Sequence, residues 1–182
     1  SSSLPLHSKT GGIIPEIAAR EQVKFIIPVI EKALFEAKII NNKLSIINAS
    51  SIDAIAVTIG PGLIGSLLVG VETAKTLAFA WEKPIIPVNH LIGHIYANFV
   101  GEMSNIKGQR SNVFPAIALI VSGGHTDLVL MKNHGKIKWL GGTRDDAAGE
   151  AYDKIGRLLN LLYPAGPMIE ELAQKGNPKA FN

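Results

Sequence analysis

Cysteine is absent from the 182-residue chain. Its absence excludes disulfide bonds and thiolate-ligated metal sites, and it favours a reducing, cytoplasmic location. Charged residues are also few, at 18%, whereas apolar residues make up 47%, a balance typical of a folded globular protein. The net charge of +3 permits contact with RNA or phosphate but does not require it.

Long apolar runs are missing as well. No uninterrupted apolar stretch reaches the ~18–20 residues that a membrane span needs, so we expect no membrane association. Residues 1–10, SSSLPLHSKT, lack the charged start and apolar core of a secretion signal. Because the chain begins without Met, we expect it to be processed or to be a piece of a longer protein.

The hydrophobic pattern predicts alternating strands and helices. Pro28 is expected to kink or break the first helix. The order of elements predicts an α/β fold with a mixed sheet, without repeats or linkers. Strands are expected at 54–59, 83–88, 114–122, 126–132 and 136–142, and helices at 15–38, 66–81, 145–162 and 168–176, with a further helix opening at His90.

A pair of histidines, His90 and His94, stands in the segment PVNHLIGH. Residues four apart on a helix share one face, so both imidazoles can converge on one ion, and imidazole suits zinc or iron. A catalytic metal site usually has three protein ligands, however, and no HExxH glutamate lies between the histidines, which disfavours a zinc protease. The spacing alone also fits two partly buried histidines with no ligand role.

Glycine-rich turns follow two of the predicted strands. In VSGGHTDLVL, Gly123 and Gly124 form a turn whose backbone can approach a ligand, with Ser122 and His125 beside it. An ordinary hairpin turn explains the glycines equally well. GPGLIG, at 60–65, fits the G-x-G-x-x-G dinucleotide fingerprint, but Glu82 precedes the next strand instead of ending it. Close strand–helix packing is therefore the favoured explanation of this second turn.

Acidic residues gather in DDAAGEAYDK, at 145–154. Asp145 and Asp146 are expected to cap a helix, while Glu150 and Asp153 lie on neighbouring parts of one face and can meet ribose hydroxyls or a metal-bound water. A solvated helix start is the simpler explanation. YPAGP, at 163–167, opens the last helix as a possible nucleoside edge or an ordinary loop.

Taken in order, the segments GGIIPEIAAREQ, GPGLIGSLLVG, PVNHLIGH, LIVSGGHTDLVL, DDAAGEAYDK and YPAGP resemble the TsaD family, the tRNA N6-threonylcarbamoyladenosine transferases, once called O-sialoglycoprotein endopeptidases. The resemblance extends from about residue 7 to the end of the chain. It implies an actin/Hsp70-like fold of two lobes, here with a first-lobe portion at 1–110 and the start of a second lobe at 111–182.

The resemblance also implies the site. It makes His90 and His94 ligands of one divalent iron or zinc ion. Threonylcarbamoyl-AMP is expected to lie against the glycine turn and two further residues, namely Ile120, Val121, Ser122, Gly123, Gly124, Asp153 and Gly166. The expected reaction transfers the threonylcarbamoyl group to the N6 amine of the adenosine beside the anticodon of tRNA, with a paralogous partner subunit and an ATPase as partners. No residue is identified as the general base.

Several features of the family pattern are missing. The opening Gly-Ile-Glu-Thr-Ser-Cys-Asp-Glu-Thr strand is absent, as are the aspartate that supplies a third metal ligand and the Gly-Gly-Val-x-x-Asn nucleotide contact. We therefore expect the chain alone to be inactive or only partly active. Two alternatives stay open, a non-catalytic binding or scaffold fragment and a dinucleotide-binding module built on GPGLIG.

Overall fold

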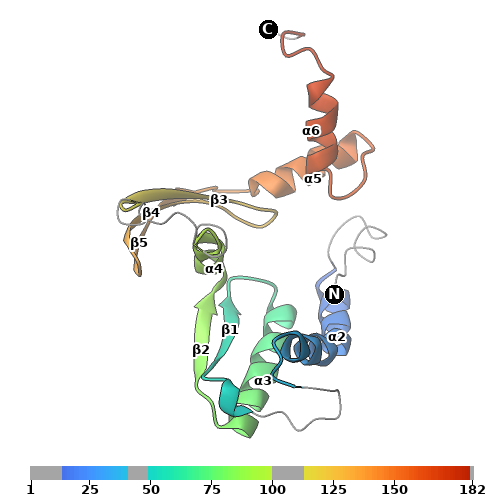
Figure 1. Cartoon of the computed structure of the whole chain (residues 1–182). Coiled ribbons are helices and arrows are strands. Elements are labelled where there is room, and N and C mark those ends of the chain that lie inside the picture. Colours follow the sequence, from blue (N-terminus) through green and yellow to red (C-terminus); the bar gives the residue numbers. More distant parts are fainter. Residues whose placement is uncertain (1–13, 41–48, 100–112, 181–182) are drawn as a thin grey trace. The chain divides into compact units, whose positions relative to one another are not determined.

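The computed structural model describes residues 14–40, 49–99 and 113–180 (Figure 1). Its contacts divide the chain into two compact units, Ser1–Gly93 and His94–Asn182. The predicted lobe boundary between residues 110 and 111 lies outside the described residues. The α/β class predicted from the sequence is confirmed by the order of the elements.

The first unit contains a parallel strand pair joined by a helix (Figure 1). Strand β1 (Ile55–Gly60) leads into helix α3 (Ile64–Trp81), which returns the chain to strand β2 (Ile85–Asn89). The strands pair in register from Ile55 opposite Ile85 to Thr58 opposite Val88. Helix α3 packs on β1, as expected of the crossover in a β-α-β unit.

Helix α2 (Pro15–Glu36) packs against α3. Pro15 stands in its first turn, where a missing N–H costs nothing. The helix continues through Pro28, so the predicted break does not occur. Small residues set the distance between the two helices, because a Cβ on Gly65 would lie 3.1 Å from the Cβ of Ala19. A short 3-10 turn, η1 (Ala49–Ser51), precedes β1.

The second unit is built on an antiparallel sheet in the order β3-β4-β5. Strands β3 (Ala116–Val121), β4 (Thr126–Asn133) and β5 (Lys136–Gly142) follow one another in the chain. Its buried side chains include Ile120, Val129 and Met131. The predicted mixed sheet is wrong for the described residues, whose parallel and antiparallel strands form two separate sheets.

Helices α5 (Ala148–Leu158) and α6 (Gly166–Gln174) end the described chain. They contact each other closely, because a Cβ on Gly156 would overlap the Cβ of Ala165. Helix α5 begins three residues later than the pattern predicted and ends at Leu158, whereas α6 begins two residues earlier. Within the described residues, no helix is both long and apolar enough to cross a bilayer.

Candidate functional site

Helix α4 (His90–Ala97) begins at the first histidine of the predicted pair. The side chain of Asn89 caps it: Oδ1 accepts hydrogen bonds from the backbone N–H groups of Leu91, at 2.9 Å, and Ile92, at 3.2 Å. His94 therefore follows His90 by about one helical turn, as predicted. The described residues contain no group of three or more His, Cys, Asp or Glu side chains that could hold a metal ion.

A cavity of about 460 Å³ lies inside the second unit, between α4 and strand β3. His94 lines it from the helix, Asn98 from the turn that follows the helix, and Met131 from β4. Its remaining wall includes Ile120, Val121 and Ser122. The structure thus brings the second predicted metal ligand together with three of the residues predicted to lie against the adenylate.

The turn between β3 and β4 is closed by Ser122. The Ser122 N–H donates to the His125 carbonyl at 2.8 Å, and the Ser122 Oγ accepts from the His125 N–H at 3.0 Å. A Cβ built on Gly123 or Gly124 would meet no described heavy atom within 4 Å. The two glycines therefore leave open space beside a fixed backbone, which is what close approach of a ligand requires.

Helix α5 is fastened to this turn by its first residues. The Ala148 N–H donates to Thr126 Oγ1 at 2.9 Å, and the Gly149 N–H donates to the Ser122 carbonyl at 3.1 Å. A Cβ on Gly149 would lie 2.7 Å from that carbonyl oxygen and 2.8 Å from Gly123 N, so no side chain fits there. SGGHT and DDAAGEAYDK are separate motifs in the sequence. In the structure these two hydrogen bonds hold them together.

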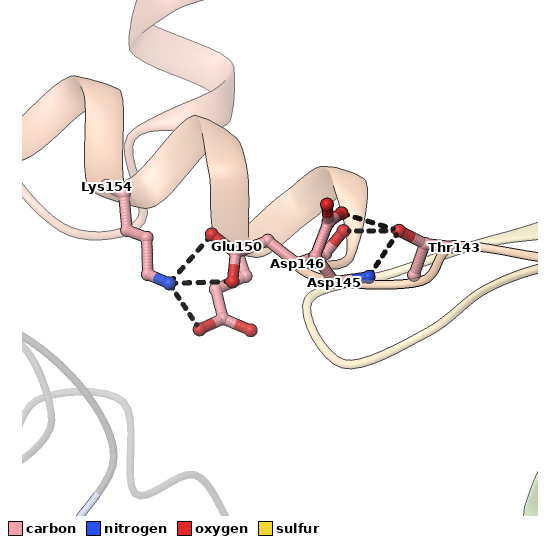
Figure 2. Close-up of polar contacts among 5 residues, drawn as sticks. All are labelled: Thr143, Asp145, Asp146, Glu150 and Lys154. Atoms are coloured by element: carbon pink, nitrogen blue, oxygen red, sulfur yellow. Dashed lines mark hydrogen bonds and ion pairs between the residues drawn. The ribbon is translucent and has the colours of Figure 1, made fainter.

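Asp145 and Asp146 do not cap α5. The residue at the N-cap is Ala147, which has no side-chain oxygen. The hydroxyl of Thr126, on strand β4, accepts the hydrogen bond from the Ala148 N–H instead. The hydroxyl of Thr143 instead donates to Asp145 Oδ1, at 3.2 Å, and to the carbonyl of Asp146, at 2.9 Å (Figure 2). The prediction of an aspartate cap is therefore wrong.

Lys154 forms ion pairs with two acidic residues of this segment, Asp146 and Glu150 (Figure 2). Its Nζ lies 2.7 Å from both carboxylate oxygens of Asp146 and 3.1 Å from Glu150 Oε1. The hydrogen bonds that it donates, first to Asp146 and then to Glu150, raise the pKa of the Lys154 ammonium above its ordinary value of 10.5. Glu150 therefore forms an ion pair with Lys154, and its predicted contact with ribose hydroxyls or a metal-bound water stays a prediction.

Asp153 holds the start of the last helix. Its Oδ1 accepts a hydrogen bond of 2.8 Å from the N–H of Ala165, the N-cap residue of α6, and Gly166 begins that helix. The structure thus places Asp153 beside Gly166, its predicted companion. A Cβ on Gly166 would meet nothing described within 4 Å, so space for a ligand is present at this edge too.

The residues that connect these parts were not all predicted. Sequence reasoning misses Gly149, although a glycine in the first turn of a helix is a signal for close backbone approach.

The GPGLIG turn has no carboxylate where a dinucleotide site needs one, since Glu82 caps the end of α3 and β2 ends at Asn89. Gly65 packs against Ala19 of α2, so this glycine allows close contact between two helices, whereas the predicted reason was strand–helix packing.

Comparison with known proteins gives a consistent result over the whole chain. The family model described as TsaD, tRNA N6-adenosine threonylcarbamoyltransferase, matches residues 1–182. Proteins of that name from Thermomicrobium roseum and Clostridium kluyveri are 54% and 50% identical, each over 100% of this chain but 47% and 49% of their own lengths. The Symbiobacterium thermophilum protein is 49% identical over 99% of this chain and 48% of its own length.

The chain thus spans about half the length of these curated relatives. Among solved structures, YeaZ from Pseudomonas aeruginosa has a TM-score of 0.38 at 19% identity, covering 69% of this chain and 53% of that one. The family match confirms the actin/Hsp70-like fold class that was expected from the sequence. On the full-length match of the family model and the identity to its members, the chain belongs to the TsaD family.

Proposed function

We propose that the intact protein transfers a threonylcarbamoyl group from threonylcarbamoyl-AMP to the N6 amine of the tRNA adenosine beside the anticodon. The names of the relatives support this activity. The structural observation that carries it is the shared cavity of His94 and Ser122, at a glycine turn fastened to α5. Because this chain spans about half of those relatives, alone it supplies only part of the site.

The reaction needs positioning more than it needs strong acid–base chemistry. The N6 amine attacks the carbamoyl carbon, the bond from that carbon to the phosphate oxygen breaks, AMP leaves, and the amine loses a proton. We propose that the N–H groups of Gly123 and Gly124 stabilise charge on the departing phosphate, since open space lies beside the turn. Ile120, Val121 and Ser122 form the wall beside it, and Asp153 with Gly166 is proposed to meet the adenosine part.

We further propose that His90 and His94 provide two of the ligands of a divalent iron or zinc ion. Imidazoles four residues apart on α4 suit either metal. The described residues do not group a third ligand with them, so the ligand set is incomplete here and we derive no reaction step through the metal. When bound, such an ion would act as a Lewis acid and template.

The same proposal includes the partners and the location. We propose that the intact protein works in the cytoplasm with a paralogous subunit and an ATPase. The lack of cysteine agrees with a reducing compartment. Helix α3, whose Phe79 is exposed, is the candidate contact for the paralogous subunit.

Calorimetric titration of the whole chain with a non-hydrolysable threonylcarbamoyl-adenylate analogue tests the adenylate site. We expect binding that Gly124→Val weakens at least tenfold, since the added side chain fills the open space, whereas Gly93→Ala leaves it unchanged. Unchanged affinity in Gly124→Val would contradict the site. Micromolar binding of NADH by the same chain would instead favour the dinucleotide alternative.

The activity and the metal are tested in the intact protein. Cells that depend on it should lose the threonylcarbamoyl mark on their tRNA when it carries His90→Ala or His94→Ala. Elemental analysis of the purified variants should show that bound iron or zinc is lost in parallel. Metal retained at full stoichiometry in both variants would refute the ligand assignment.

A further inference from the structure

Positive charge is concentrated in one hairpin of the second unit. Residues 128–144 contain Lys132, Lys136, Lys138 and Arg144 but no aspartate or glutamate, in a chain with 18 basic and 15 acidic residues. The three lysines lie on β4 and β5, on either side of the turn at His134 and Gly135, and all three are exposed. This hairpin end therefore carries charge well above the average of the chain.

These lysines differ in their surroundings from several lysines of the described helices. On α2 and α3, Lys24, Lys32 and Lys75 each form an ion pair with a glutamate of the same helix. None of the ion pairs formed within the described residues includes a lysine of the hairpin. The charge of the hairpin lysines is thus available to an anionic partner, whereas each of the three helix lysines already pairs with a glutamate of its own helix.

The turn that presents the lysines is held in place. The Gly135 N–H donates to the hydroxyl of Tyr96 at 3.0 Å, and Gly135 adopts a φ of +69°, which favours glycine. The ring of His134 lies 4.8 Å from that of Phe114 and 5.4 Å from that of Phe99, edge to face in both cases. These contacts fasten the hairpin end to α4 and to the start of β3.

The same hairpin connects the basic end to the candidate adenylate site. Strand β4 runs from Thr126, beside the glycine turn, to Asn133, beside the lysines. Eight residues of strand span roughly 25 Å. An RNA whose adenosine meets the carbamoyl group beside the glycine turn therefore has its flanking backbone within reach of the lysines.

We propose that Lys132, Lys136 and Lys138 form a docking surface for the phosphate backbone of the RNA substrate. The inference rests on the proposed function, since the relatives are named for their action on tRNA. Phosphate contacts position a nucleic acid and make its affinity depend on salt, without reading its sequence.

The test compares two triple variants of the whole chain that remove equal charge. One carries Lys132→Gln, Lys136→Gln and Lys138→Gln, and the control carries Lys24→Gln, Lys32→Gln and Lys75→Gln. Binding of a fluorescent anticodon stem-loop RNA is followed by anisotropy at several salt concentrations. We expect the hairpin variant to lower the slope of log affinity against log salt by about 2, at ~0.7–0.9 for each lost phosphate contact, while the control keeps it.

A further measurement makes the result decisive. Replacing the hairpin lysines by arginine should restore the slope, because charge and not lysine itself is required. An equal fall in both triple variants, an unchanged slope in the hairpin variant, or tighter binding to anionic lipid vesicles than to the RNA would overturn the proposal.

The outcome separates this inference from the proposed function. If the adenylate analogue binds but the hairpin variant keeps its salt dependence, the docking surface is wrong and the adenylate site stands. If the analogue does not bind while the hairpin variant alone loses affinity for RNA, the adenylate site fails and the RNA surface is confirmed.

Discussion

Gly149 is the residue on which the candidate site most depends. Its missing side chain lets α5 reach the Ser122 carbonyl, and a Cβ there would lie 2.7 Å from that oxygen. We expect Gly149→Ala to destabilise the chain by about 1–3 kcal/mol through overpacking and to weaken binding of the adenylate analogue. Gly141→Ala is the matched control, because a Cβ there meets nothing within 4 Å. Urea unfolding checks both, and equal stability of the two variants would contradict the close contact.

Lys154 gives a prediction about pH. Its folded-state pKa is raised by Asp146 first and Glu150 second, so its stabilising contribution is present below its ordinary pKa of 10.5 and is lost as pH rises through the raised value. An NMR titration of the Lys154 ε-carbon should therefore have its midpoint above 10.5. Asp146→Asn should lower that midpoint more than Glu150→Gln does. A midpoint at or below 10.5 in the unsubstituted chain would show that the pairing in Figure 2 does not persist in solution.

At the scale of the element, α5 and α6 are joined through one glycine. A Cβ on Gly156 would overlap that of Ala165, although alanine is otherwise the better residue in a helix. We expect Gly156→Ala to cost about 1–3 kcal/mol or more in unfolding free energy. The double variant Gly156→Ala with Ala165→Gly should recover most of that loss, and urea unfolding of all four proteins gives the coupling between the two positions. Additive costs would contradict direct packing.

The elements themselves were largely predictable from sequence, and the reason is local. Periodicity marks β5 at its observed bounds, and Asn89 before the histidine pair is a typical helix cap. The joining of the elements was not predictable, because it depends on tertiary contacts. No local pattern shows that Thr126 caps α5 from another strand, or that Asp153 is bonded to Ala165. For the same reason the aspartates before α5 suggested a cap that the structure does not contain.

At the scale of the whole molecule, each compact unit carries its own tryptophan, Trp81 in α3 and Trp139 in β5. The chain has two tryptophans, so Trp81→Phe and Trp139→Phe leave one reporter for each unit. Gly156 and Ala165 contact each other inside His94–Asn182. We therefore expect Gly156→Ala to lower the urea midpoint reported by Trp139 while the midpoint reported by Trp81 stays within error.

The comparison needs one control, because Trp139→Phe also removes the hydrogen bond to Asp127. Each reporter is therefore compared with and without Gly156→Ala in the same single-tryptophan background. Since buried side chains such as Ala74 and Ala78 belong to the first unit, and Val129 and Met131 to the second, each unit has apolar contacts of its own to lose. A parallel shift of both reporters would mean that the two units unfold as one cooperative structure, and that a defect at α5 reaches the strands of the first unit.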